Sequence, residues 1–569
     1  MDVLSAISGF LDAVDNFIWG VPLMVLILFG GILLTVRLHG VQFRRLGKAL
    51  KYMIKNEEGG TGEVTSFGAL CTALSATIGT GNIVGVATAI CAGGPGAMLW
   101  MWIAALFGMA TKYSEGLLAV KFRSVNKKTG HVLGGPFYYI ERGMGPRWRW
   151  LAKMFAFFGV CVGLLGIGTF TQVNSISSAI LGFFDPDKSA VAFSLFGMDY
   201  SYATVIGGLF VAVFVGLVVI GGLKRIASVS EKVIPTMVII YLFISILLIV
   251  CNLDKIPAAF VEIFCGAFGL KAFAGGMLGS MMIAMQMGIA RGIFSNEAGL
   301  GSAPIAAAAA QTKEPTRQGL VSMTGTFLDT IVVCSMTGLS IVMTGAYLVP
   351  GLEGSAVTTY AFQAGLPFIP PEVVSFIIML CLVLFGFTTI LGWDYYSERC
   401  LEYLTNGRMG AVKVYRWVYI LAVFIGPYMT VSAVWTIADI FNGLMAIPNM
   451  IALIALSGVI KKETFDYFGR LKAAGGVESK MEPRGKESDW KVPLPTGDDI
   501  GSVAVVSFNE GVSDGAVRIF DNALRSLKEM TLSCRRTLTR KAENFVSLHI
   551  KVGKICISPP RLTYKIDFA

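Results

Sequence analysis

Long apolar runs recur along the first 460 residues, and short polar loops separate them. A helix needs roughly 20 apolar residues to cross a bilayer core about 30 Å thick. The pattern therefore predicts an all-α integral membrane protein of about eleven spans. These lie near residues 17–37, 66–91, 96–121, 149–182, 202–222, 232–251, 275–312, 319–346, 371–400, 414–435 and 439–460.

Basic residues concentrate in every second loop of this arrangement. Clusters of Lys and Arg follow the first span and each alternate span after it, whereas the remaining loops contain only Lys188, Lys255 and Lys271. Lys and Arg are retained on the cytoplasmic side of membrane proteins. The alternation predicts a multi-pass protein of the cell (cytoplasmic) membrane, with its N-terminus outside and its C-terminus inside.

The chain from Glu463 onward has a different character. It is polar and charged and contains no run long enough to span a membrane. We expect a membrane domain at residues 1–462 and a partly disordered cytosolic extension at 463–569. Within the extension, SVAVVSF is typical of a strand and AVRIFDNALRSLKEM of an amphipathic helix.

Composition agrees with the membrane assignment and excludes other classes. The chain is 54% hydrophobic and 15% charged, whereas soluble proteins carry about 25% charge. The net charge is +10, but no basic stretch is interleaved with aromatic residues on a soluble domain, so nucleic-acid binding is not expected. Three histidines and ten scattered cysteines without a CxxC pair argue against a His-based metal enzyme or a disulfide framework.

The second predicted span is interrupted near its middle by the string SATIGTGN at Ser75–Asn82. Each glycine weakens a helix by about 1 kcal/mol relative to alanine. An unwound segment here would present N–H groups and a helix N-terminus to an anion, and C=O groups to a cation. The glycine spacing does not match the dinucleotide fingerprint and no βαβ unit surrounds it, so no organic cofactor is expected.

The seventh predicted span, 275–312, is too long for one crossing, and glycines, a proline, an arginine and a glutamate crowd its middle. It is the fifth span after the other interrupted span. Without 17–37, the spans form two sets of five, 66–251 and 275–460, which run in opposite orientation because five is odd. Interrupted helices at matching positions point to a transporter binding site. Glycines that only permit close helix packing are the alternative.

Several strings resemble a known family. GGPGAMLWMWIAALFG (Gly93–Gly108) is similar to the signature of the alanine or glycine:cation symporters, also called sodium:alanine symporters. The signature usually has Phe-Trp-Met-Trp where this chain has LWMW. SATIGTGNIVGVATAI, GGPFYYIERGMG, FTQVNSI and ARGIFSNEAGLGSAP also resemble blocks of the family. The resemblance covers roughly residues 1–465.

The resemblance implies a fold of the leucine-transporter type, a five-plus-five inverted repeat with one extra N-terminal helix. It also implies uptake of alanine or glycine by alternating access, coupled to Na⁺, with some relatives able to use H⁺. The expected partners are therefore a small neutral amino acid, Na⁺ and the lipid bilayer. The sequence does not specify an oligomeric state.

Five residues are candidates for substrate contact. Amides of Thr80 and Gly81, at the start of a half-helix, suit a carboxylate, and the resemblance supports both. The resemblance also places Gln172 in the pocket; the alternative is an interhelical hydrogen bond. The oxygen of Asn296 is suited to the ammonium or, alternatively, to capping a half-helix. Trp393 is suited to limiting substrate size or, alternatively, to ordinary packing.

The span at 371–400 carries two adjacent hydroxyls, Thr388 and Thr389, in an apolar surrounding. A hard cation without carboxylate ligands needs several carbonyl and hydroxyl oxygens. With the carbonyls of Ser75, Ile78 and Phe385, these threonines resemble the Na⁺ site of the fold. The alternative is that both threonines hydrogen-bond to their own helix.

Charged residues inside spans are functional candidates by default. Arg291 and Glu297 flank the second interruption, and we expect them to form a structural or gating pair. Asp329 and Asp394 are further intramembrane acids, and each is a candidate proton site if transport is coupled to H⁺.

Two other functional classes fit less well. An ion channel would show pore-lining repeats and a selectivity-filter string, which are absent. A membrane enzyme would require a motif such as Gly-x-Ser-x-Gly or His-Glu-x-x-His, and neither is found. The preferred prediction is a Na⁺-coupled symporter rather than an enzyme; an H⁺-coupled carrier is the closest alternative, and a channel is less favoured.

Overall fold

The computed structural model describes residues 3–55, 57, 60–125, 131–187, 189–195, 198–270, 276–429 and 431–481. Within these ranges, nine helices are long and apolar enough to cross a membrane, or ten if a bent pair is counted as one span. These ten correspond to ten of the eleven predicted spans. The other predicted span is a helix of 25 residues, Ala97–Lys121, which contains Lys112 and Glu115 and does not meet that criterion.

The first half of the chain is helical apart from two short hairpins. Its elements are α1 (Val3–Ile18), α2 (Val21–Arg37), α3 (Val41–Arg44), α4 (Leu46–Ile54), α5 (Ser66–Thr77), η1 (Thr80–Asn82), α6 (Val84–Gly93), α7 (Ala97–Lys121), β1 (Ser124–Val125), β2 (Val132–Leu133), α8 (Pro136–Gly143), η2 (Pro146–Trp148), α9 (Arg149–Leu165), α10 (Phe170–Phe184), β3 (Val191–Leu195), β4 (Met198–Ser201), α11 (Tyr202–Val219), α12 (Gly222–Cys251), η3 (Leu253–Lys255) and α13 (Ile256–Ala267). Strands β1 and β2 pair antiparallel, as do β3 and β4.

The second half contains the remaining elements. They are α14 (Met277–Asn296), α15 (Ala303–Ala307), α16 (Pro315–Thr326), the π-helical turn η4 (Phe327–Cys334), α17 (Ser335–Thr344), η5 (Ala346–Leu348), α18 (Ser355–Gly365), α19 (Pro371–Leu404), α20 (Met409–Ile425), η6 (Gly426–Tyr428), α21 (Val431–Ala455), α22 (Ser457–Ala473) and η7 (Glu478–Lys480).

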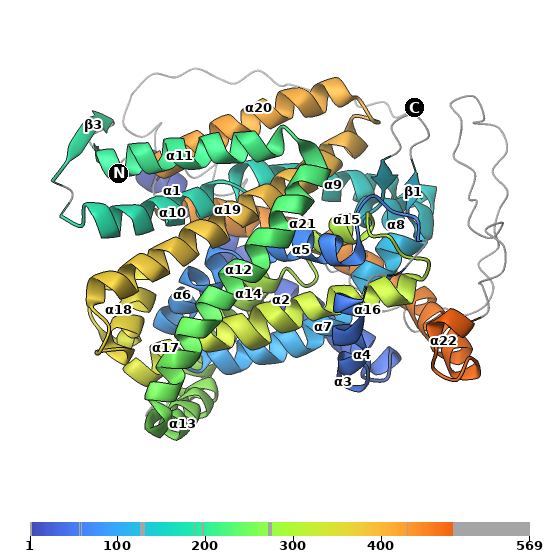
Figure 1. Cartoon of the computed structure of the whole chain (residues 1–569), viewed down its shortest axis with the longest axis horizontal. Helices are drawn as coiled ribbons and strands as arrows, with labels where there is room; N and C mark the ends of the chain where they lie inside the picture. The colour runs from blue at the N-terminus through green and yellow to red at the C-terminus, as the bar shows by residue number, and fades with distance from the viewer. Residues whose placement is uncertain are drawn as a thin grey trace, which may run out of the picture. The chain divides into compact units, whose positions relative to one another are not determined.

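The long helices run lengthwise between two ends of the bundle (Figure 1). The left end in that view carries α13, α18 and β3, and the right end carries α4, α8, β1 and α22. Helix α19 packs against α5, α9, α10 and α12, and its residues from Thr388 to Cys400 are all buried. By contrast, α11 exposes large apolar side chains such as Phe210 and Phe214. Such an apolar outer face is what a lipid environment requires.

The predicted span 149–182 is long and apolar enough to cross a membrane as one segment, Pro146–Phe184, but this segment is interrupted near its middle. Helix α9 ends at Leu165, and α10 begins at Phe170. At this break the hydroxyl of Tyr419 donates to the carbonyls of Gly168 and Ile390, both at 2.7 Å. Tyr419 thereby fastens the break to α19, because Ile390 belongs to that helix.

Folded structure continues past the predicted boundary at residue 462. Helix α22 crosses that boundary and runs to Ala473. On α22, Glu463 pairs with Lys121 of α7, and Arg470 pairs with Glu314 at 2.8 Å. The predicted strand and amphipathic helix of the extension lie outside the described residues.

Glu478, just beyond α22, ties the end of the described chain to the bundle. It pairs with Arg317 of α16 and accepts a hydrogen bond from Tyr467 at 2.5 Å. Burial raises the pKa of the Glu478 carboxyl, but hydrogen bonds from Tyr467 and Tyr52 and the charge of Arg317 outweigh burial. The pKa of Glu478 is therefore held below its ordinary value.

We predict that Glu478→Gln lowers the apparent melting temperature of the purified protein near neutral pH. The loss corresponds to about 1–2 kcal/mol for a hydrogen-bonded charged group. Because the folded-state pKa is depressed, this stabilisation is present above the unfolded pKa of about 4.3 and is lost as the pH falls through the folded value. Thermal unfolding of both proteins across the acidic range measures the difference.

The matched control is Glu353→Gln. Glu353 is exposed and comes two residues before α18, and α18 lies at the opposite end of the bundle in Figure 1. We expect this variant to melt like the unsubstituted protein. A Glu478→Gln difference that is equally large at acidic pH would contradict the assigned role of the Glu478 charge.

Candidate functional site

The first predicted interruption is a break in the helix. Helix α5 ends at Thr77, and the segment Thr80–Gly93 leaves it at an angle of 60°. Two amides at the break are satisfied by side chains: Gly79 N–H donates to the Asn82 side-chain oxygen at 2.9 Å, and Thr80 N–H donates to the Gln172 oxygen at 3.2 Å. The protein itself therefore provides partners for backbone groups that a regular helix would pair internally.

The second predicted interruption is also a break. Helix α14 ends at Asn296, and Glu297 has a φ of 55°, in the left-handed region that is uncommon for a residue with a side chain. Gly299 and Gly301 follow with φ values of 92° and 82°. The side-chain oxygen of Asn296 accepts from Ala298 N–H at 2.9 Å. In this conformation Asn296 closes the turn that follows α14. It does not cap the second half-helix, because α15 begins only at Ala303 and has Ser302 at its N-cap.

Asp329 joins the two breaks. This carboxylate lies in the π-helical turn η4 and accepts from the Asn82 amide at 2.7 Å and from the Ser295 hydroxyl at 2.9 Å. Asn82 belongs to the first break and Ser295 to the last turn of α14, before the second. π-Helical turns occur frequently at functional sites. The sequence indicated Asp329 as an intramembrane acid, but it contains no signal for these partners.

The predicted pair between Arg291 and Glu297 is wrong. Arg291 pairs with Asp439 of α21 at 2.8 Å. Glu297 accepts from the Trp393 indole at 2.8 Å and from the Ser302 hydroxyl at 2.5 Å. The two side chains point in different directions because α14 ends at Asn296, which lies between them in the sequence. In addition, the backbone of Glu297 is in the left-handed conformation.

Glu115 and Asn449 complete the second break, and the sequence reasoning missed both. Gly299 N–H donates to Glu115 at 3.1 Å, and the Asn449 amide donates to Glu115 at 2.7 Å and to the Gly299 carbonyl at 2.9 Å. Lys112, one turn before Glu115 on α7, is 2% exposed. The sequence did contain a signal for Glu115, Asn449 and Lys112, because charged and amide residues inside predicted spans are candidates for a structural or functional role.

The predicted ion-site residues lie on two helices that face each other. A Cβ added to Gly79 would meet the Thr389 hydroxyl at 2.3 Å, and one added to Gly392 would meet the Ser75 hydroxyl at 2.8 Å. Ser75 and Ile78 are therefore placed against α19 at the level of Thr389. The Thr389 hydroxyl donates to the Phe385 carbonyl at 3.0 Å. This is the hydrogen bond within its own helix that the alternative interpretation predicted. The lone pairs of the Thr389 oxygen remain available to another ligand.

Thr388 points elsewhere. Its hydroxyl also donates to the Phe385 carbonyl at 3.0 Å, but it lies 3.7 Å from the Met237 sulfur of α12. The two neighbouring threonines thus face different helices, since successive residues on a helix do not share a face.

The predicted substrate residues of the first break are enclosed. Thr80, Gly81 and Gln172 are all buried. The Thr80 hydroxyl has no hydrogen-bond partner within the described part of the chain. Buried hydroxyls normally have partners, so this oxygen is available to a ligand. Trp393 is 1% exposed and contributes to the second break through its bond to Glu297.

The geometry defines a class of protein. One membrane helix is bent by 60° at its break, a second membrane helix, α14, ends in an irregular segment that begins at Glu297, and buried polar side chains join the two breaks; this is the arrangement of a secondary transporter. Comparison with known proteins identifies the family. Residues 4–481 match the model described as the sodium:alanine symporter family. The chain belongs to this family and is a transporter, not an enzyme.

Curated relatives match most of the chain. An uncharacterized transporter of Haemophilus influenzae is 54% identical, over 82% of this chain and 97% of its own length. The sodium/alanine symporter AgcS of Methanococcus maripaludis is 43% identical, over 82% and 97%. The probable sodium/glutamine symporter GlnT of Bacillus subtilis is 35% identical, over 81% and 90%. Among solved structures, MhsT in complex with L-phenylalanine is similar, with a TM-score of 0.48, 15% identity, and coverage of 76% and 96%.

We predict that Gly79→Ala reduces uptake of labelled amino acid about tenfold or more. The added Cβ would lie 2.3 Å from the Thr389 hydroxyl, so α19 and the first break must separate, and misplacement of about 1 Å is enough to cost such a factor. Uptake is measured in vesicles that contain equal amounts of each protein. Gly85→Ala is the control because nothing lies within 4 Å of its added Cβ. Equal uptake by both variants would show that the close approach at Gly79 is dispensable.

Proposed function

We propose that the protein is a secondary active symporter that couples inward Na⁺ movement to uptake of alanine or glycine by alternating access. The observation that carries this proposal is the first break. It brings a helix N-terminus and the unpartnered Thr80 hydroxyl next to the Thr389 region of α19. Membership of the sodium:alanine symporter family and the printed activity of the relative AgcS support the same choice.

The substrate would be held as a zwitterion between the two breaks. Amides of Thr80 and Gly81 precede α6, where the helix dipole favours a carboxylate. Thr80 N–H now bonds to the neutral Gln172 side chain, an interaction that a charged carboxylate can replace. The Asn296 side-chain oxygen would give up its hydrogen bond from Ala298 N–H and would accept one from the substrate ammonium instead. Trp393 would limit the side chain to a small one.

Sodium would be carried at the contact between α5 and α19. We assign the carbonyls of Ser75, Ile78 and Phe385 and the hydroxyls of Thr388 and Thr389 as its ligands. Na⁺ is a hard cation that takes several oxygen ligands, as other hard cations do. The proximity of Ser75 to Gly392 and of Gly79 to Thr389 supports this assignment. Thr388 must turn from Met237 to take part.

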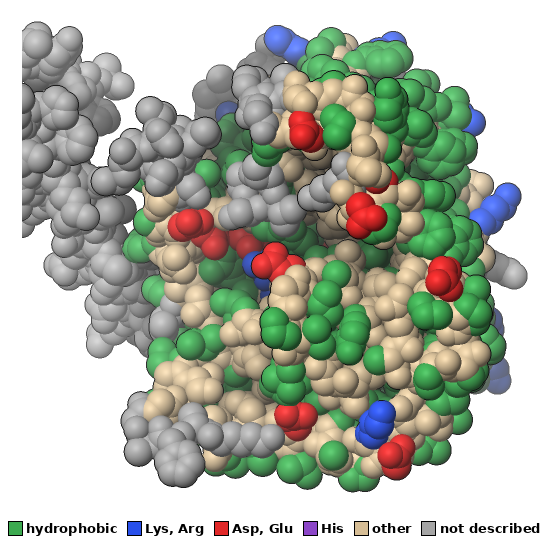
Figure 2. Space-filling model, turned by 90° about the vertical axis from the view of Figure 1, so that its left-hand side faces the viewer, with side chains coloured by type: hydrophobic (Ala, Val, Ile, Leu, Met, Phe, Trp, Pro, Cys, Tyr) green, Lys and Arg blue, Asp and Glu red, His purple; other side chains and the backbone are tan. Residues whose placement is uncertain are grey.

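We further propose that residues 66–251 and 275–460 are two inverted repeats, with α2 as the extra helix. The breaks begin the two repeats at matching positions. The basic loops that follow α2, α7, α19 and α21 would lie in the cytoplasm. Figure 2 shows the opposite end, where Asp and Glu side chains are spread over the face and Lys and Arg lie mostly near its rim. This face would be outside the cell.

The direct test is labelled alanine or glycine uptake into vesicles that contain the purified protein, with an imposed Na⁺ or H⁺ gradient. We expect accumulation against a concentration gradient with Na⁺ and exchange of labelled for unlabelled solute. Accumulation driven only by H⁺ would favour the proton-coupled alternative. If the labelled solute only flows down its own concentration gradient and never accumulates, the result would indicate a channel.

We predict that Thr389→Ala raises the Na⁺ concentration for half-maximal uptake about tenfold or more. Loss of one ligand to a desolvated ion is worth about 1.5–3 kcal/mol. Thr405→Ala is the matched control, because Thr405 makes the same bond to its own helix, to Leu401 at 2.8 Å, at the end of α19. Initial uptake rates at varied Na⁺ distinguish them, and an unchanged Na⁺ requirement in Thr389→Ala would refute the ion assignment.

A further inference from the structure

Asp394 is a buried acid that the mechanism above does not use. It lies on α19 directly after Trp393 and has no exposed surface. Neither of its carboxylate oxygens has a hydrogen-bond partner within the described residues. The other described acids with no exposed surface, Asp329, Glu297 and Glu115, each accept at least two hydrogen bonds. Asp394 therefore differs from these acids because it has no hydrogen-bond partner within the described residues.

The charged neighbours of Asp394 do not compensate its charge. Glu398 follows it by one helical turn, and a second carboxylate disfavours ionisation. Arg416 of α20 is the nearby cation, but it is bonded to Glu398 at 2.5 and 2.8 Å. Tyr415 and Tyr419 of α20 are the other titratable groups in reach. Within the described residues, Glu398 and Arg416 are the charged groups that act most strongly on Asp394.

These surroundings determine the protonation state. An ionised carboxylate without hydrogen bonds is far more costly to bury than a neutral carboxyl group. Asp394 therefore holds a proton in this conformation.

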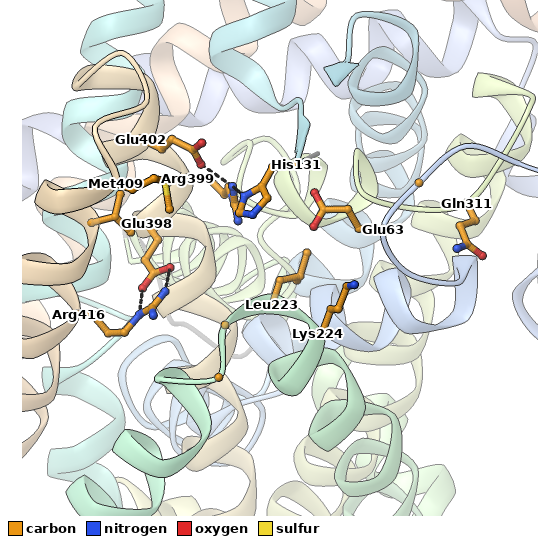
Figure 3. A pocket seen from close by; sticks show the side chains of 14 residues that line it. Glu63, His131, Leu223, Lys224, Gln311, Glu398, Arg399, Glu402, Met409 and Arg416 are labelled. Atoms are coloured by element: carbon orange, nitrogen blue, oxygen red, sulfur yellow. Dashed lines mark hydrogen bonds and ion pairs between the residues drawn. The ribbon is translucent and has the colours of Figure 1, made fainter. Parts of the chain in front are cut away.

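A charged cavity begins one turn away from Asp394. It has a volume of about 640 Å³ and is lined by Glu63, His131, Glu398, Arg399, Glu402 and Arg416, among others. In Figure 3, Glu398 pairs with Arg416 on one wall, and Arg399 lies between Glu402 and His131. Asp394 and Glu398 are four residues apart, which is about 6 Å along a helix. The cavity therefore comes within one helical turn of Asp394, which does not itself line it.

Helix α19 connects Asp394 to both breaks. Thr389 contacts the first break at Gly79, and Trp393 donates to Glu297 in the second. A conformational change that rearranges either contact also moves the next turn of α19. The loops that line the cavity belong to the end assigned above to the cytoplasm, so this step rests on the proposed function.

We propose that Asp394 is a proton-binding site of the transporter that must release its proton into this cavity, on the cytoplasmic side, in each transport cycle. When the inner halves of the broken helices move, water reaches the carboxyl group. The O–H bond of Asp394 breaks, and the proton passes to water and leaves through the cavity. The entering water and Arg416, which is then shared between Glu398 and Asp394, stabilise the carboxylate. The cycle closes when the transporter opens outward and the carboxylate takes up a proton from external water, before the resting conformation returns.

The test varies the internal pH of right-side-out membrane vesicles at constant external pH and constant Na⁺ gradient. We expect alanine uptake by the unsubstituted protein to fall about fivefold or more as the lumen is acidified from about pH 8 to about pH 6, because proton release is opposed. Asp394→Asn resembles the protonated acid and cannot release a proton, so it should take up alanine slowly, at about the rate of the unsubstituted protein at low internal pH, and independently of internal pH. Asp394→Glu should restore the dependence.

Glu372→Gln is the matched control, because Glu372 is an exposed acid at the other end of the same helix, and it should keep the original profile. A pH profile that persists in Asp394→Asn would overturn the proposal and assign the titration to cavity residues such as His131. An unsubstituted protein insensitive to internal pH would also overturn it, whether or not the variants fold. Absence of alanine uptake at every pH would instead contradict the proposed function.

Discussion

Every backbone amide and carbonyl in a membrane helix must have a partner within the protein, and this constraint organises the centre of the molecule. Each break releases groups that a continuous helix would satisfy. Side chains replace the lost bonds: Asn82 and Gln172 serve the first break, and Glu115 and Asn449 serve the second. The buried polar residues of the core are therefore a structural consequence of the breaks before they have any role in transport.

The same bonds make the core able to change conformation. A broken helix held by its own backbone bonds would be rigid, whereas one held by side chains can exchange partners when a ligand offers stronger ones. Thr80 N–H, now paired with Gln172, is such a group. Asp329 joins the two breaks, so a ligand that alters one break alters the bonds available to the other. This is the physical basis for coupling two cargoes.

Local patterns were sufficient to predict most of the fold. Span lengths and glycine-rich interruptions are properties of neighbouring residues, and the helices are interrupted at both predicted places. The second interruption does not separate two half-helices, because α14 is long enough to span alone and α15 has five residues. Partners distant in sequence were not predictable: Asn82 and Asp329 are 247 residues apart. Arg291 and Glu297 are close in sequence, yet the reversal at Glu297 separates them. The break between α9 and α10 was missed because its glycines resemble the packing glycines found throughout this chain, and α22 was missed because its amphipathic sequence does not resemble a span.

Helix α19 is the element through which these features act together. It meets the first break through Thr389 and Gly392, the second through Trp393, and the charged cavity through Glu398. Its middle is buried on all sides, so it cannot shift without changing at least one of these contacts. A helix constrained in this way responds to the state of both breaks at once. That response requires no separate signalling element between the proposed substrate region, the proposed ion region and the cavity.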